Sequence, residues 1–339
     1  MAMISKKKLI YPVNEQLRDY LKQQERVSEA LAYDDLTRYS SAIPLYDQQG
    51  KDTLWETVLY EQAEIEHIHK SLKLVYSNLK SAGHIEVIEH LYIDRVDICP
   101  FGNTKPFRIR IVNSINDNFD YFYIKIADAS RIYGLELEHL LSPNRINYIV
   151  HGNTLVEEHI IGIPGDQFIL NNLGDKGLNK VRLAKEFVKF NERTFIRLLG
   201  DMHSSNFVLD ITPDFEEVHY RIRAIDFDQQ SFEGRKAVYF AKYFKQNNAL
   251  IKLGMEVMTP ESMHQYELEE RSLIVNRIRS SRYTLNELLS AMKTTPLSLD
   301  KHIRQLRKEL ADYHGDSKFL KCTTMGAIVE LNLAQLEID

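Results

Sequence analysis

The chain has 339 residues, of which 44% are hydrophobic and 27% are charged, so it can bury a sizeable core arranged in two or three lobes. Its net charge of −5 and its pI near 6.2 argue against general binding to nucleic acid or to an anionic membrane surface, because phosphate groups are held by clustered Lys and Arg.

The first thirteen residues contain the run Lys6-Lys7-Lys8 and then an apolar stretch that is too short for a signal peptide. No later window offers the roughly eighteen continuous apolar residues of a membrane span. We therefore expect a cytoplasmic protein without a membrane partner. The two cysteines, Cys99 and Cys322, lie far apart in the sequence and lack the spacing of a zinc site or a disulfide scaffold, so we interpret both as buried thiols.

The first predicted elements are helices. Residues 14–36 and 53–81 lack Gly and Pro, and the apolar residues of the second stretch recur at three- and four-residue intervals. These apolar residues include Trp55, Val58, Leu59, Ala63, Ile65, Ile68, Leu72, Val75 and Leu79. The pattern predicts a helical N-terminal segment over residues 1–82.

A β-rich lobe is predicted over residues 83–163. β-Branched and aromatic residues are concentrated in five stretches, 85–93, 107–115, 121–127, 146–150 and 154–161. The turn Asn116-Asp117-Asn118 joins the second stretch to the third, and one helix over 131–141 interrupts the series before Pro143. Together these features predict a small antiparallel sheet with one helix.

The second half of the chain predicts a mainly helical lobe over residues 164–339. A helix over 180–199 leads into Gly200-Asp201, and a hairpin is expected from 207–211 and 218–225 around Thr212-Pro213-Asp214. Everything after Gly234 has the composition of helices.

Chemistry-bearing residues follow the long helix. Asp201 and Asn206 stand five residues apart in Gly-Asp-Met-His-Ser-Ser-Asn, the D-x-x-x-x-N spacing of a catalytic loop in which the Asp orients the acceptor and the Asn binds metal. Asp226 follows at the end of the hairpin, which returns the chain so that this carboxylate can face Asn206. Two such oxygen donors suit Mg²⁺.

These segments, Gly200 to Asn206 and then Ile225-Asp226-Phe227-Asp228, resemble the catalytic segment of aminoglycoside-phosphotransferase-type enzymes within the protein-kinase-like superfamily. The resemblance covers about residues 85 to 235 and implies a bilobal α+β fold that uses ATP and Mg²⁺. It also implies that Lys125, in Tyr-Ile-Lys-Ile, contacts the α- and β-phosphates. A glutamate on the next helix should pair with this lysine; helical phase favours Glu136, and Glu138 is the second choice.

The resemblance further implies that residues 158–160, Glu158, His159 and Ile160, contact the adenine through their backbone. His203 is a candidate for proton transfer, although support of the loop through a hydrogen bond explains it equally well. Asp228 stands where protein kinases have the Gly of their DFG motif. Because small-molecule kinases of this type tolerate another residue there, Asp228 is a candidate additional metal ligand.

The chain also departs from kinase patterns. It contains neither a G-x-G-x-x-G loop nor a P-loop motif, and the turn Pro100-Phe101-Gly102-Asn103-Thr104 is the best substitute for gripping phosphates. Gly200 replaces the Arg that many protein kinases carry before the catalytic Asp, so control by a phosphorylated activation loop is not expected. The segment between Ile160 and Asp201 is short, so acceptor recognition is expected from the C-terminal helices.

The expected function is transfer of the γ-phosphoryl group of ATP to a hydroxyl of a small molecule or a protein. One alternative is a catalytically silent kinase-like module that binds a nucleotide or a partner. Another is a two-metal phosphoesterase, since Gly-Asp-Met-His superficially matches the opening of such a motif, although the later ligand block of that class is missing from the sequence.

Overall fold

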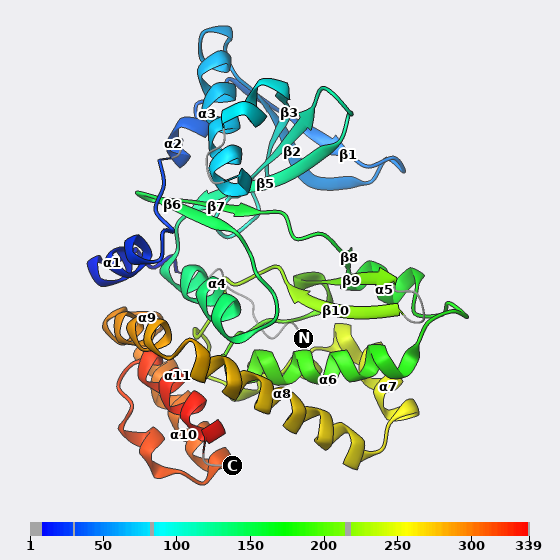
Figure 1. The fold of residues 1–339 in the computed structure, drawn as a ribbon, viewed down its shortest axis with the longest axis vertical. Coiled ribbons are helices and arrows are strands. Elements are labelled where there is room, and N and C mark those ends of the chain that lie inside the picture. Colours follow the sequence, from blue (N-terminus) through cyan, green and yellow to red (C-terminus); the bar gives the residue numbers. More distant parts are fainter. Residues whose placement is uncertain (1–8, 30, 82–84, 214–217, 338–339) are drawn as a thin grey trace. The chain divides into compact units, whose positions relative to one another are not determined.

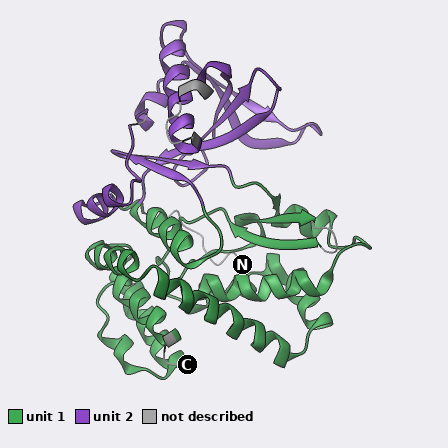
Figure 2. Cartoon of the chain, in the orientation of Figure 1, with its two compact units in different colours: residues 1–11, 129–145, 160–339 green, residues 12–128, 146–159 purple. Residues whose placement is uncertain are grey.

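The computed structural model describes residues 9–29, 31–81, 85–213 and 218–337. The lysine run at 6–8, the expected boundary between 82 and 83, and Asp214 of the expected turn lie outside these ranges. The chain divides into two compact units (Figure 2). We call residues 12–128 and 146–159 the sheet unit and the remainder the helical unit.

The sheet unit is built on seven antiparallel strands in the order β1-β2-β3-β4-β5-β7-β6 (Figure 1). The strands are β1 (Ser41–Tyr46), β2 (Asp52–Leu59), β3 (Leu91–Ile98), β4 (Phe107–Asn113), β5 (Phe119–Ile126), β6 (Tyr148–His151) and β7 (Thr154–Glu158). The α-helices of this unit are α1 (Glu15–Gln23), α2 (Tyr33–Leu36) and α3 (Gln62–Ser81), and the 3₁₀-helix η1 (Ile85–His90) precedes β3.

Alternation of side chains along the strands forms the core of this sheet. In β4, Phe107, Ile109 and Ile111 are buried, whereas Arg108 and Arg110 are half-buried, as expected when successive side chains point to opposite faces. Helix α3 contacts β3 and β7 and contributes its own buried apolar residues to the same cluster. These residues are Ile68, Leu72, Val75 and Leu79.

The helical unit contains a small sheet and most of the helices. Its strands, β8 (Ile163–Pro164), β9 (Phe207–Pro213) and β10 (Val218–Ala224), pair in the order β10-β9-β8. Its helices are α4 (Ala129–Leu141), α5 (Gly165–Asn171), α6 (Lys180–Ile196), α7 (Asn248–Val257), α8 (Pro260–Ser280), α9 (Arg282–Thr294), α10 (Asp300–His314) and α11 (Met325–Ala334). Its 3₁₀-helices are η2 (Ser204–Asn206), η3 (Lys236–Tyr239), η4 (Ala241–Tyr243), η5 (Lys245–Asn247), η6 (Ser317–Lys321) and η7 (Gln335–Glu337).

Helix α6 is the centre of this unit, because it contacts α7, α8, α11 and β10. Its start is set by Asn179, whose side chain accepts a hydrogen bond from the backbone N–H of Arg182 at 3.1 Å. Helix α8 starts at a capping box between Thr259 and Ser262, with Pro260 at its first position.

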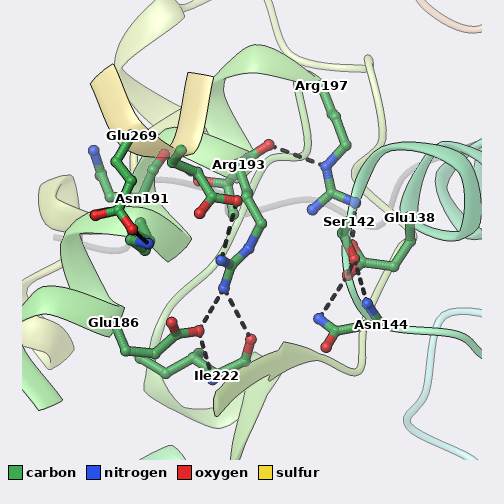
Figure 3. Close-up of polar contacts among 12 residues, drawn as sticks. Glu138, Ser142, Asn144, Glu186, Asn191, Arg193, Arg197, Ile222 and Glu269 are labelled. Atoms are coloured by element: carbon green, nitrogen blue, oxygen red, sulfur yellow. Dashed lines mark hydrogen bonds and ion pairs between the residues drawn. The ribbon is translucent and has the colours of Figure 1, made fainter. Parts of the chain in front are cut away.

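Two buried arginines of α6 and its C-terminus hold the helical unit together (Figure 3). Arg193 donates to Glu186 at 2.6 Å and to Glu270 of α8 at 3.3 Å. Arg197 donates to the backbone oxygen of Arg193 at 3.0 Å and forms an ion pair with Glu138 of α4. Because a buried charge is tolerated only when it is paired and hydrogen-bonded, these contacts fix α4, α6 and α8 to one another.

The expected α+β class is confirmed: an antiparallel sheet forms one unit, and helices dominate the other. The hairpin after Asn206 is also confirmed as β9 and β10. The helix expected over 53–81 was wrong in its first part, because residues 52–59 form strand β2 and the helix starts only at Gln62. Residues 85–90 likewise form η1, so the strand expected at 85–93 runs instead from Leu91 to Ile98.

The compact units differ from the expected division of the chain. Residues from 12 through α3 belong to the sheet unit, whereas they were expected to form a separate helical segment. Helix α4 belongs to the helical unit, although it was expected in the β-rich lobe. Helix α4 contacts α8 and α9 of that unit, and the buried pair between Glu138 and Arg197 ties it to the end of α6.

Within the described parts of the chain, no helix combines the length and the apolar character that crossing a membrane requires. Both cysteines are present as thiols; Cys322 is buried and Cys99 is half-buried.

Candidate active site

Backbone hydrogen bonds to other segments of the helical unit hold the loop after α6 in place. Leu198 and Asp201 both adopt left-handed conformations, with φ of +54° and +63°, which are uncommon for residues other than Gly. The intervening Gly200 donates to the backbone oxygen of Gln229 at 3.2 Å, and Asp201 donates to that of Val238, also at 3.2 Å. Neighbouring backbone therefore fixes the direction in which the Asp201 side chain leaves the loop.

Asp201 has the protonation behaviour of a group that can accept a proton near neutral pH. Burial raises its pKa to about 7, and the negative charges of Asp226 and Glu233 contribute to the increase. A general base is most effective when its pKa lies near the working pH. The catalytic role of Asp201 stays a prediction, and the structure adds that this carboxylate has an unusual environment.

His203 lies beside this carboxylate, with Nε2 at 4.0 Å from Oδ1 of Asp201. Its Nδ1 accepts from the backbone N–H of Ser205 at 3.3 Å, and its ring packs against Phe244. Burial lowers the pKa of His203, although the charges of Asp226 and Asp166 oppose that effect. These contacts favour support of the loop over direct proton transfer.

Asn206 connects the loop to the strand that ends at Asp226. Its side-chain Nδ2 donates to the backbone oxygen of Asp201 at 2.8 Å, which turns the amide oxygen away from that carbonyl. Its own backbone oxygen accepts from the N–H of Ile225 at 3.0 Å. The structure thus brings the backbone of Asn206 into contact with Ile225, the residue before Asp226, and a shared metal site of Asn206 and Asp226 stays a prediction.

Asp226 and Asp228 are joined by a cation that sequence reasoning missed. Nη1 of Arg131, at the start of α4, lies 2.9 Å from Oδ1 of Asp226 and 2.8 Å from Oδ1 of Asp228. Nη2 of the same arginine donates to the backbone oxygen of Ile225 at 3.2 Å. A basic residue near the start of a helix gives little sequence signal, and its partners lie 95 and 97 residues further along the chain.

The two glutamates of α4 have different environments. Glu138, the second choice as partner of Lys125, pairs with Arg197 and accepts from Ser142 Oγ at 2.6 Å and Asn144 Nδ2 at 2.9 Å. Burial alone would raise the pKa of Glu138, but Arg197 and these hydrogen bonds lower it below its usual value. Glu136 is also buried, and its pairing with Lys125 stays a prediction.

Lys125, in the sheet unit, has a partner that the sequence analysis did not identify. Its Nζ lies 2.7 Å from Oε2 of Glu157 on β7, and both side chains are buried. Since β5 pairs with β7 so that Lys125 faces Leu155, Glu157 is the next residue on the same side of the sheet. The sequence signal that could have identified this partner is Glu157 itself, a charged residue that directly follows the apolar residues of Thr-Leu-Val-Glu-Glu.

The stretch at 158–160 already uses two backbone donors. Glu158 N–H donates to Asn147 at 3.0 Å, and His159 N–H donates to Tyr121 at 3.3 Å. The side chain of Glu158 is held by Lys80, and His159 Nδ1 lies 3.2 Å from the hydroxyl of Tyr123. Adenine contacts by Glu158, His159 and Ile160 stay a prediction.

The oxygen donors near the loop are of the kind that magnesium prefers. Asn206 offers an amide oxygen and Asp226 a carboxylate whose side chain is 37% exposed, and hard oxygen donors of this kind suit Mg²⁺ together with water and phosphate oxygens. Asp228 is 14% exposed and shares the cation of Arg131. Among the residues that the structure describes, no group of three or more His, Cys, Asp or Glu side chains forms a metal cluster.

Comparisons with known proteins give structural matches only. No protein-family model and no curated protein matches the chain. A structure titled "Titin kinase and its flanking domains" matches at 14% identity with a TM-score of 0.28, over 71% of this chain and 54% of that one, so the chain spans about half of it. The autoinhibited serine kinase domain of the giant muscle protein titin matches at 12% identity and a TM-score of 0.29, over 71% of this chain and 92% of that one. Both TM-scores are below 0.3, so neither match carries an argument about this chain.

Proposed function

We propose that the chain is a phosphotransferase that uses ATP and magnesium and transfers the γ-phosphoryl group to a hydroxyl of a small molecule or a protein. The observation that carries the proposal is the connected loop of the helical unit. Asn206 bonds to the backbone of Asp201 on one side and to that of Ile225 on the other, while the pKa of Asp201 is raised to about 7.

In this mechanism Asp201 orients the acceptor hydroxyl and takes its proton as the O–P bond to the acceptor forms and the β,γ-bond of ATP breaks. A bound magnesium ion would neutralise charge on the phosphates and on the departing ADP, and Asn206 and Asp226 would hold it. Hydrogen bonding from the loop keeps Asp201 in place, and His203 supports that loop. Lys125 stays the proposed contact to the α- and β-phosphates, and 158–160 the proposed adenine-contacting stretch.

One specific observation favours a second function, a silent nucleotide-binding module. Arg131 already places a positive charge between Asp226 and Asp228. If this arginine replaces the metal entirely, the chain would bind a nucleotide without magnesium and without turnover. No comparable observation favours a phosphoesterase.

A direct experiment distinguishes these functions. Purified chain would be incubated with γ-labelled ATP and pools of hydroxyl-bearing acceptors, with and without Mg²⁺, and nucleotide binding would be followed in parallel by thermal shift, which rises with the logarithm of ligand excess. Label transfer that requires Mg²⁺ and disappears in Asp201→Asn supports the phosphotransferase. Nucleotide stabilisation without Mg²⁺ and without transfer supports the silent module, and no response to nucleotide contradicts both.

The acceptor screen needs a matched control. Asp210→Asn changes a half-buried aspartate on β9, in the same hairpin that connects Asn206 to Asp226. It is expected to transfer label at the wild-type rate, because it lies outside the loop contacts described above.

A further inference from the structure

The ion pairs of Arg131 form a three-residue group with one cation and two carboxylates. A single nitrogen, Nη1, lies 2.9 Å from Asp226 and 2.8 Å from Asp228, and the backbone N–H of Asp228 donates to Oδ1 of Asp226 at 2.9 Å. The two carboxylates would repel each other at this separation without a shared positive charge. Arginine stays protonated under all ordinary conditions, so this charge is permanent.

Exposure is graded across the group. The side chain of Arg131 is 3% exposed, that of Asp228 is 14% exposed and that of Asp226 is 37% exposed. A divalent ion arriving from solvent therefore meets Asp226 before Asp228, and the buried guanidinium lies beneath both. The formal charge of the three side chains is −1, which one divalent ion is sufficient to offset.

Arg131 cannot easily move away from this position. The adjacent Ser130 donates from its hydroxyl to the backbone oxygen of Gln230 at 3.2 Å. On the same helix, Gly134 packs against Phe227, where an added Cβ would lie 3.0 Å from the Cβ of the phenylalanine. The start of α4 is thus fixed directly against the segment that carries Asp226 and Asp228.

The location of this arginine is also informative. A positive charge in the first turn of a helix is unfavourable, because the helix dipole makes that end positive. Both carboxylates compensate for this cost at Arg131, so the arginine and the two aspartates depend on each other.

We propose that Arg131 is a positioning residue that limits the site to one divalent ion, because its pairing with Asp228 withholds that carboxylate from coordination. This inference rests on the proposed function for the identity of the site, but it concerns the binding of the ion rather than turnover. It also contradicts the expectation that Asp228 is an additional ligand.

The test is a titration with Mn²⁺, a paramagnetic substitute for Mg²⁺, followed by electron paramagnetic resonance, with and without a non-hydrolysable ATP analogue. Wild-type chain is expected to bind one Mn²⁺ per chain. Asp226→Asn should lose this binding, whereas Asp228→Asn should still bind one Mn²⁺, weakened by no more than about tenfold, the effect of losing one neighbouring charge. Loss of binding in Asp228→Asn, or two ions in the wild type, would overturn the proposal.

Arg131→Met provides the second arm, with Arg131→Lys as its matched control. Removing the positive charge should tighten Mn²⁺ binding by about tenfold or admit a second ion, because the repulsion between the guanidinium group and the divalent ion disappears. The lysine variant keeps the charge and should resemble the wild type. Identical binding by the methionine variant and the wild type would contradict the proposal, and if that variant does not fold, the Asp228→Asn result decides.

The outcomes also separate this inference from the proposed function. If the wild type and the variants bind Mn²⁺ as expected above but no label is transferred from ATP, the role of Arg131 is supported and the phosphotransferase is rejected. Label transfer together with no detectable Mn²⁺ binding, or with two bound ions, rejects the role of Arg131 instead.

Discussion

Glu138 and Arg197 form an ion pair in which the two side chains are 2% and 1% exposed. The pair joins α4 to the residue after α6, four residues before Asp201. Ser142 and Asn144 donate further hydrogen bonds to Glu138, so the carboxylate is well satisfied within the fold.

Breaking this pair should destabilise the protein strongly. We expect Arg197→Met to lower the free energy of unfolding by about 3–5 kcal/mol, because it leaves a buried carboxylate without its cation. Urea denaturation followed by circular dichroism would measure the change. The control is Asp19→Asn, which removes an exposed pair with Lys22 and should cost less than about 1 kcal/mol. Similar losses in both variants would contradict the importance of burial.

Asp201 should make the metal-free protein less stable as the pH rises. Its pKa is about 7 in the folded state against an ordinary value of 3.8, so between these values the folded state binds more protons than the unfolded state. The free energy of unfolding contributed by this group therefore falls from about pH 4 to pH 7 and is level above that. The free energy of unfolding of Asp201→Asn should therefore exceed that of the wild type by an amount that increases over the same pH range.

Denaturation curves at pH 4, 5.5, 7 and 8 would test this prediction in buffers containing a chelator. Asp210→Asn, on strand β9, is measured alongside as a variant that removes an aspartate outside the contacts of Asp201. A constant difference between Asp201→Asn and wild type across the series would show that the pKa of Asp201 is not raised.

Substitutions of Asp201 and Asp226 should have different effects on catalysis and on nucleotide binding. We expect Asp201→Asn to lower kcat by about 10²- to 10⁴-fold, the usual contribution of a positioned base, with nucleotide binding nearly unchanged. Asp226→Asn should instead abolish both transfer and the magnesium-dependent part of nucleotide binding. Single-turnover kinetics and calorimetric binding of ATP would separate the two effects. Wild-type turnover in both variants would rule out the assignment.

The buried pair of Lys125 and Glu157 allows its structural and functional roles to be separated. Glu157→Gln should lower stability by about 3–5 kcal/mol, since Lys125 then lacks its carboxylate partner. The double change Lys125→Met with Glu157→Leu should restore much of that stability, because an apolar pair of similar volume needs no ion pairing.

If Lys125 also contacts phosphates, the restored double variant should still show a higher KM for ATP than the wild type. A double variant with normal stability and a normal KM would mean that the lysine serves only the fold.

The sequence could identify features that depend on neighbouring residues. The hairpin after Asn206 has clear alternation and a turn, and the spacing of Asp201 and Asn206 is itself a local pattern. The loop from Asp201 to Asn206 and the hairpin that follows it were therefore predictable. The raised pKa of Asp201 was not, because it depends on burial and on Asp226 and Glu233, which are distant in sequence.

Strand β2 was mistaken for helix because its apolar residues, Trp55, Val58 and Leu59, also fit a helical spacing that continues into α3. The missed signal was the preceding turn, where Gly50 has a φ of +76° and Asp47 accepts from two backbone donors. A turn followed by β-branched and aromatic residues predicts a hairpin.

The partners of Arg131 and Lys125 were beyond sequence reasoning for another reason. Each pairing joins residues that are far apart in the chain, and charged side chains are usually solvated, so a sequence gives no ground for selecting a buried partner. Only the folded chain identifies Glu157, Asp226 and Asp228 as the carboxylates involved.

Membership of α4 in the helical unit has a consequence for regulation. Arg131, Asp226 and Asp228 all belong to one compact body. The charge balance around Asp226 is therefore set within the helical unit. A regulator that displaces this helix would first have to extract a buried guanidinium from between two carboxylates.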